Sequence, residues 1–212
     1  MAAEFTIPGQ RQTVVSNSNN MLLTIATSIN STSGYLPYNL ANAMGAPGIE
    51  NTANCYIINA PGIYSLPLVY GNAVKNGEPN PSAYTSSAGG TNILSNFVNH
   101  LDAPITDPYI YNNADCSPFH AMLIWQDEKD LVTNVTLEYD RRSLTFEVPK
   151  ASIRQGNAIV AVCDENYRIM WSWHIWVTDY VPGLEPTVTD SHDPDKTCRD
   201  KVVTDYQGVQ HT

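Results

Sequence analysis

The sequence predicts an all-β protein: an antiparallel immunoglobulin-like β-sandwich with an N-terminal extended, loop-rich region and at most one short helix. Short apolar segments that alternate with a period of two follow one another across residues 120–180. Turn-forming residues separate these segments at regular intervals, as in sandwich proteins. The strongest segment, residues 168–180, holds three of the chain's 4 tryptophans among many β-branched residues, a composition that favours strands.

The 212 residues divide into four predicted parts. Residues 1–50 form a loop-rich N-terminal region, in which residues 21–25 are one strand or a short helix. Residues 51–118 form a β-hairpin, a long loop and a short helix that pack on the sandwich. Residues 119–181 supply the core strands of the sandwich, and residues 182–212 form a polar C-terminal tail.

The first half of the chain contains one predicted hairpin and one predicted helix. Residues 55–59 and 63–70 are apolar segments on either side of an Ala-Pro-Gly turn, so we expect them to pair as a hairpin. Pro67 removes a backbone donor, which favours an edge position or a bulge. Residues 93–101 place apolar side chains at helical spacing and are the best helix candidate.

The second half contains the predicted core strands. Residues 121–127 are predicted as a buried strand, and residues 158–163 lead through a four-residue turn into the tryptophan strand. Between them, residues 135–148 are expected to form a hairpin with six side chains in the core, namely Val135, Leu137, Tyr139, Leu144, Phe146 and Val148. In the tryptophan strand the predicted core face consists of Trp171, Trp173, Ile175 and Val177. In the tail, only residues 201–204 have a strand pattern.

Charge and apolar patterning narrow the range of partners. The net charge is −10, and Lys and Arg form no cluster, which argues against nucleic acid as a partner and against binding to an anionic membrane surface. No stretch approaches the roughly 20 apolar residues of a membrane-spanning helix, so we expect no membrane insertion. The 4 cysteines are scattered and lack zinc-site spacing, so they are expected to be either free or paired in up to two disulfides.

No motif indicates catalysis, and we expect neither enzymatic activity nor a cofactor. The sequence has no Gly-x-Ser-x-Gly elbow and no phosphate-binding glycine loop. Asp127, Glu128 and Asp130 could serve as the carboxylates of a glycosidase or as calcium ligands. The alternative, which the lack of calcium-loop spacing favours, is that they are solvated acidic turns. We therefore expect no catalytic, cofactor-binding or metal-binding residues.

Aromatic residues offer the candidate ligand or partner surface. His174 and Trp176 lie on the amphipathic face of the tryptophan strand, where exposed rings could stack on a sugar. Alternatively, Trp176 packs beneath a loop and His174 is hydrogen-bonded locally. Tyr84, Tyr109 and Tyr111 are interpreted in the same two ways, as packing residues or as a binding surface.

Several ordered motifs resemble segments of fimbrillin-like cell-surface proteins of Bacteroides-type bacteria. These motifs are ANCYIINAPG (residues 53–62), PLVYGNA (67–73), IYNN (110–113), QGNAIVAV (155–162) and WSWHIWVTDY (171–180). The resemblance implies a lipid-anchored all-β protein of the cell surface, of fimbrial or adhesin type. Members of that family generally begin with an export signal, which this sequence lacks, and continue beyond the point where it ends. The resemblance thus implies an exported, longer parent protein, and it supplies no catalytic residues.

We therefore expect a non-enzymatic cell-surface or extracellular protein that acts in attachment or assembly. Its partners would be other protein subunits, joined by addition of a strand to an open sheet edge, with a terminal segment involved in the exchange. The alternative for the tail is a monomer in which it covers the protein's own edge. The alternative function is a carbohydrate-binding module that recognises host or dietary glycan, and a third class is a glycoside-active enzyme.

Overall fold

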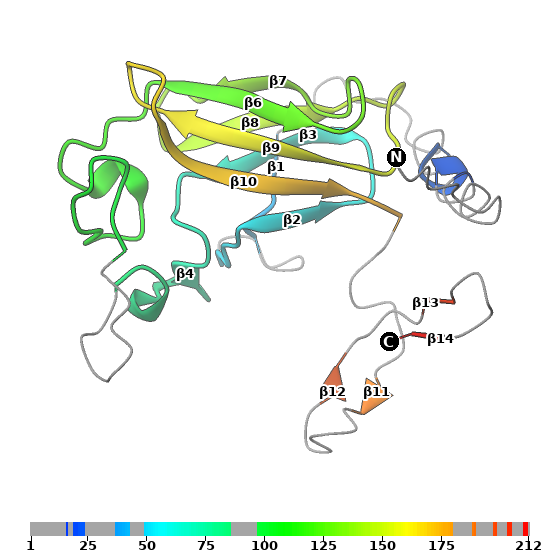
Figure 1. Ribbon diagram of the computed structural model, residues 1–212, viewed down its shortest axis with the longest axis horizontal. Helices are drawn as coiled ribbons and strands as arrows, with labels where there is room; N and C mark the ends of the chain where they lie inside the picture. Colours follow the sequence, from blue (N-terminus) through cyan, green and yellow to red (C-terminus); the bar gives the residue numbers. More distant parts are fainter. Residues whose placement is uncertain are drawn as a thin grey trace, which may run out of the picture.

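Two four-stranded sheets form the main body of the protein in a computed structural model (Figure 1). The structure describes residue 16 and residues 19–23, 37–42, 49–85 and 97–179, together with the short strands at 188–189, 197–198, 203–204 and 210–211. Most of the regular structure in these residues is β-strand, and the helical part comprises residue 16, residues 19–23 and two short 3-10 turns, η1 (Pro81–Ala83) and η2 (Ile110–Asn112). The prediction of a mainly β protein with little helix is confirmed for the described residues.

The first sheet, called the β8 sheet, has the strand order β1-β3-β8-β7. Its strands are β1 (Tyr38–Asn39), β3 (Gly62–Pro67), β8 (Ser143–Val148) and β7 (Thr133–Leu137). β1 runs parallel to β3, whereas β3–β8 and β7–β8 are antiparallel. The predicted β7–β8 hairpin is confirmed.

The second sheet, called the β10 sheet, has the strand order β2-β10-β9-β6. Its strands are β2 (Cys55–Ile58), β10 (Ile169–Val177), β9 (Gly156–Cys163) and β6 (His120–Gln126). β10 and β6 are antiparallel to β9, but β2 runs parallel to β10. Both sheets are therefore mixed, although only antiparallel pairing was predicted.

The buried faces of the two sheets share one hydrophobic core. It includes Trp173 and Ile175 of β10, Val160 of β9 and Phe146 of β8, all of which are at most 1 % exposed. In β8 the predicted alternation holds, with Leu144, Phe146 and Val148 buried. Val135 and Leu137 are partly buried against the core, but Tyr139 is fully exposed. The prediction for Tyr139 is wrong because β7 ends at Leu137 and Tyr139 belongs to the turn that follows.

The predicted hairpin between residues 55–59 and 63–70 is wrong. β2 pairs with β10, and β3 pairs with β8, so the Ala60-Pro61-Gly62 turn carries the chain from one sheet to the other. Each strand buries alternate side chains against the common core. Because a local turn signal is the same for a hairpin and for a crossing between sheets, the sequence could not distinguish them. Pro67 is the last residue of β3, where a missing donor interrupts little of the ladder.

β6 is an edge strand of the β10 sheet, not the buried strand that was predicted. Ala121 and Leu123 pack against the core, whereas Ile124 and Trp125 are 41 % and 51 % exposed. The pairing register of β6 with β9 shifts between Leu123 and Trp125. A bulge of this kind interrupts the alternation and turns apolar side chains toward solvent.

The described part of the predicted helix at residues 93–101 is not helical. Phe97 to Leu101 contain no helical residue, and Val98 forms an isolated bridge with Pro104. The side-chain oxygen of Asn99 accepts hydrogen bonds from the amides of Leu101 and Ala103. Such a bond offers the backbone an alternative to a helix, which the apolar spacing does not reveal. Residues 93–96 lie outside the described residues.

Several short elements complete the fold. β4 (Val74–Lys75) and β5 (Glu78–Pro79) pair around Asn76 and Gly77, whose φ angles of 55° and 79° suit a tight hairpin turn. In the tail, β11 (Val188–Thr189) pairs with β12 (Thr197–Cys198), and β13 (Val203–Thr204) pairs with β14 (Gln210–His211). The tail thus has more strands than residues 201–204 alone. Within the described residues, no helix has the length and apolar character needed to cross a membrane.

Candidate functional site

The face of the β10 sheet that points away from the core carries the candidate site. Trp173, Ile175 and Val177 point into the core, so Ser172, His174 and Trp176 lie on the opposite side, called here the outer face. The register brings chemically active residues of neighbouring strands beside them. His174 pairs with Cys55 of β2 and with Ile159 of β9, and Trp176 pairs with Asn157 of β9.

Four side chains on this face form a continuous hydrogen-bonded array, called here the Cys55 array. Cys55 Sγ lies 3.1 Å from His174 Nδ1, and His174 Nε2 lies 2.9 Å from Asn157 Oδ1. Asn157 Nδ2 donates to Asp127 Oδ2 at 2.8 Å, and the Asn157 amide donates to Asp127 Oδ1 at 2.7 Å. The array therefore consists of Cys55, His174, Asn157 and Asp127, in that order.

The hydrogen bonds of the array determine which nitrogen of His174 carries the proton. Asp127 accepts from the Asn157 amide group, so the carbonyl oxygen of that side chain is the atom that faces His174. A carbonyl oxygen only accepts, which places the imidazole hydrogen on Nε2. His174 Nδ1 then has a free lone pair, and it accepts the hydrogen of the Cys55 thiol.

Cys55 is a free thiol that solvent can reach. Cys116 and Cys163 are also free, but both are buried. Burial of part of the Cys55 side chain raises the pKa of its thiol. The thiol is therefore protonated at neutral pH, in the form that the hydrogen bond to His174 requires.

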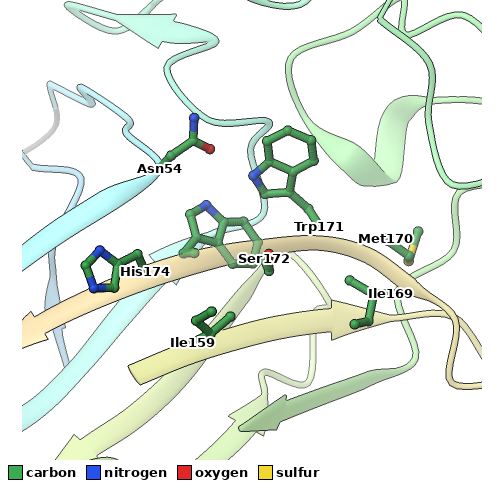
Figure 2. A pocket seen from close by; sticks show the side chains of 8 residues that line it. Asn54, Ile159, Ile169, Met170, Trp171, Ser172 and His174 are labelled. Atoms are coloured by element: carbon green, nitrogen blue, oxygen red, sulfur yellow. The ribbon is translucent and has the colours of Figure 1, made fainter. Parts of the chain in front are cut away.

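An open groove of about 480 Å³ begins at His174 and runs along β10 (Figure 2). Ile159, Ile169 and Trp171 give it apolar walls, and Asn54, Ser172 and His174 add polar groups; Met170 and Trp173 complete its lining. Figure 2 shows Asn54 and the Trp171 ring on the same side of the β10 ribbon. The groove is thus mainly apolar, with a polar end at the Cys55 array.

Trp171 is only partly buried, although the alternation predicted it as a core residue like Trp173. From Trp171 to Val177 the pairing register with β9 is continuous, so Trp171 lies on the same face as Trp173 and packs against the core. It lies outside the segment of β10 that pairs with β2, which begins at His174. The Trp171 ring packs edge-on against Tyr70, with 5.3 Å between ring centroids. Its Nε1 is buried and has no hydrogen-bond partner among the described residues.

Two tryptophans are exposed on the β10 sheet. Trp176 is 39 % exposed on the outer face of β10, and Trp125 is 51 % exposed on β6. Trp125 pairs with Ile159, which in turn pairs with His174, so the outer face carries a row from Trp125 through Ile159 to His174. β6 and β10 are separated by β9 alone, which places the two strands about 10 Å apart. The alternative in which Trp176 is covered by a loop does not hold for the described residues.

The three predicted tyrosines lie elsewhere. Tyr84 is buried in the core, whereas Tyr109 and Tyr111 pack with their rings tilted by 36° and 5.6 Å between centroids in a separate cleft of about 440 Å³. The Tyr109 hydroxyl donates to Glu50 at 3.2 Å, and burial together with the Glu50 charge raises the pKa of Tyr109 to about 12. Arg142 lies over the Tyr111 ring at 5.7 Å. The five candidate residues therefore do not form one surface.

Sequence reasoning missed most of the Cys55 array. It treated Cys55 as a possible disulfide partner and Asp127 as part of an acidic turn, and it assigned Asn157 no role. Cys55 and His174 are 119 positions apart and meet only because β2 pairs with β10. The predicted hairpin had placed residues 55–59 against residues 63–70, away from the tryptophan strand. The described residues contain no group of three or more His, Cys, Asp or Glu side chains placed to hold a metal ion.

Comparisons with protein-family models, with curated proteins and with solved structures give no match for this chain.

Proposed function

We propose that this is a non-enzymatic cell-surface protein of fimbrial-subunit or adhesin type, which acts in attachment or assembly, and that its two sheets form an immunoglobulin-like sandwich. The observation that supports assembly most directly is the edge strand β6. It is seven residues long, and among the described strands only β9 pairs with it. β7 of the β8 sheet lies close to the other edge of β6 but does not pair with it, so this is the edge that a strand from another chain would take.

The side chains of β6 favour an added strand. Ile124 and Trp125 are both more than one third exposed, and Phe119, just before the strand, is 45 % exposed. An arriving strand would cover these apolar groups as well as satisfy the backbone groups of the edge. The bulge between Leu123 and Trp125 divides the edge, so the regular segment from His120 to Leu123 is the better template.

Size-exclusion chromatography with light scattering tests strand addition. The full chain should form dimers or larger species at high concentration. Ile124→Lys should raise the dissociation constant of these species at least about tenfold, because it places a charge at the edge. Tyr139→Lys is the matched control, because Tyr139 is fully exposed and lies outside the strands. A chain that ends at residue 182, mixed with a synthetic peptide of residues 196–212, tests whether the tail is the added strand.

The proposal fails if the full chain is a monomer at every concentration. A monomeric shortened chain that also leaves the peptide unbound would show that the tail is not the strand donor.

The second candidate function is recognition of a glycan, which the exposure of Trp125 and Trp176 favours. Exposed indole rings provide flat apolar surfaces on which sugar rings can stack. A glycan array probed with the full chain tests this function directly. Trp125→Ala and Trp176→Ala should each lower binding to any positive glycan, whereas Tyr139→Ala should not. A blank array, or positive glycans that bind both tryptophan variants unchanged, would remove this candidate.

A further inference from the structure

We propose that Cys55 is a nucleophilic thiol that takes up an acyl group from an activated ester or thioester, with His174 as its general base. The inference goes beyond the attachment function and does not rest on it. Two requirements define an activated nucleophile: a base within hydrogen-bond reach, and a third group that orients the base. Cys55, His174 and Asn157 meet both requirements at 3.1 and 2.9 Å.

The tautomer of His174 is the one that the reaction needs. Because Nε2 donates to Asn157 Oδ1, Nδ1 is unprotonated and faces the thiol. Asp127 holds the Asn157 side chain in this orientation through its amide hydrogens. Asn157 and Asp127 are positioning residues, since neither touches the sulfur.

The backbone is adapted to keep the array in place. Cys55, His174 and Asn157 all lie on paired strands of one sheet, so their relative positions follow from the register. Residue 156 is a glycine, and a Cβ there would lie 2.7 Å from Asp127 Oδ1 and 2.8 Å from Leu131 Cδ2. Only a residue without a side chain therefore lets Asp127 approach the Asn157 amide this closely.

The environment of Cys55 differs from that of the other described cysteines. Cys116 also has a histidine nearby, with 4.0 Å between its Sγ and His100 Nδ1, but it is buried and also contacts Tyr70 and Asn99. Cys163 is buried beside Met122. Cys55 alone among these three combines an exposed sulfur with a closely held imidazole. Because burial keeps its thiol protonated at neutral pH, its reactivity depends on the base.

The groove beside His174 indicates the kind of acyl group. Its walls are formed by Ile159, Ile169 and Trp171, so an apolar acyl chain would be removed from water there. The substrate class is therefore an ester or thioester of an apolar carboxylic acid.

The chemical step transfers one acyl group. His174 Nδ1 removes the thiol proton as Cys55 Sγ attacks the carbonyl carbon, which forms the carbon–sulfur bond. The bond from that carbon to the leaving alcohol or thiol then breaks, and the leaving group takes the proton back from His174. The products are S-acyl-Cys55 and the free alcohol or thiol, with no change of oxidation state. The reaction is stoichiometric and ends at the modified cysteine.

The first test measures acylation of the native chain by p-nitrophenyl acetate and p-nitrophenyl hexanoate, which differ in their apolar chain. All proteins carry Cys198→Ser, so that the tail cysteine does not contribute. Intact mass should show addition of one acyl group, and peptide mapping should place it on Cys55. Cys55 should react at least about tenfold faster than the same cysteine in a synthetic peptide of residues 50–60, because the peptide thiol has no base. The ratio of the rate of the native chain to the rate of the peptide should be larger with the hexanoate than with the acetate.

The second test assigns the roles within the array. His174→Gln should lower the rate about 10²-fold, and Asn157→Ala about tenfold. Between about pH 7 and 9 the wild-type rate should change little, whereas the rate of His174→Gln should rise with thiolate formation, about tenfold per pH unit. The acylation rate of Asn157→Ala should also depend more steeply on pH than the wild-type rate does. Replacement of a merely structural residue would not change this dependence.

The proposal is overturned if Cys55 in the native chain reacts no faster than the peptide, or if the acyl group is found on another residue. It is also overturned if a folded His174→Gln protein reacts at the wild-type rate. If that variant does not fold, the comparison of native chain and peptide decides the question alone.

Discussion

Replacement of Trp173 by alanine should strongly destabilise the protein. Trp173 is 1 % exposed and is among the largest fully buried side chains. It lies in β10, opposite Val160 of β9, where paired strands on both sides restrict collapse of the backbone into a cavity. Truncation of a buried tryptophan costs about 3–5 kcal/mol. For a chain of this size, that corresponds to a decrease in Tm of roughly 6–20 °C.

Trp176→Ala is the matched control, because it removes the same side chain from the same strand on the opposite face. Trp176 is 39 % exposed, so its truncation should cost no more than about 1 kcal/mol. Thermal unfolding followed by far-ultraviolet circular dichroism measures both variants, and urea unfolding gives the free energies. If Trp173→Ala melts within a few degrees of the wild type, or if both variants lose equal stability, the assignment of the two faces of β10 is wrong.

Four further predictions concern close packing, pH and metal ions. Gly156→Ala should destabilise the protein by about 1–3 kcal/mol in urea unfolding, because the new methyl group would collide with Asp127 and Leu131; an unchanged midpoint would contradict this. Burial lowers the pKa of His100, so stability should fall as the pH drops below about 6.5, the ordinary histidine value, and His100→Gln should reduce this loss. Burial alone would raise the pKa of Asp164, but hydrogen bonds from Arg168 and the Asn166 amide outweigh it and lower that pKa. The stability that Asp164 contributes should therefore be present above about pH 4 and lost below it. In Asp164→Asn, the melting temperature should depend less on pH below about pH 4. Melts with and without EDTA should superimpose, because the described residues gather no metal-binding cluster; a decrease of about ten degrees would refute this expectation.

The side-chain pattern of individual strands could be predicted, because it is a local property of the sequence. The alternation of Leu144, Phe146 and Val148 identifies both β8 and its buried face. The same reasoning fails where the backbone departs from regular pairing. Trp125 follows a register shift, and apolar alternation alone cannot show where such a shift occurs. Tyr139 was misplaced because the pattern does not mark where a strand ends.

The partners of the strands could not be predicted, because pairing joins segments that are distant in the sequence. The sequence shows that residues 55–59 form a strand, but not that this strand lies against β10. The candidate site depends on that pairing, since it alone brings Cys55 to His174. His174 and Trp176 were identified from their own strand, whereas Cys55 and Asn157 required the neighbouring strands. Asp127 required in addition the hydrogen bonds that connect it to Asn157.

The crossing between sheets at Ala60-Pro61-Gly62 has a consequence for folding during synthesis. β2 and β3 emerge early from the ribosome, yet their main partners, β10 and β8, are made about 80 to 120 residues later. Until then, Tyr56, Ile58 and Leu66 have no sheet to cover them. Such long-range pairing slows folding and exposes strand edges that promote aggregation. The nascent chain is therefore expected to need a chaperone until β10 has been synthesised. Stalling synthesis before residue 169 should leave the chain in a protease-sensitive state.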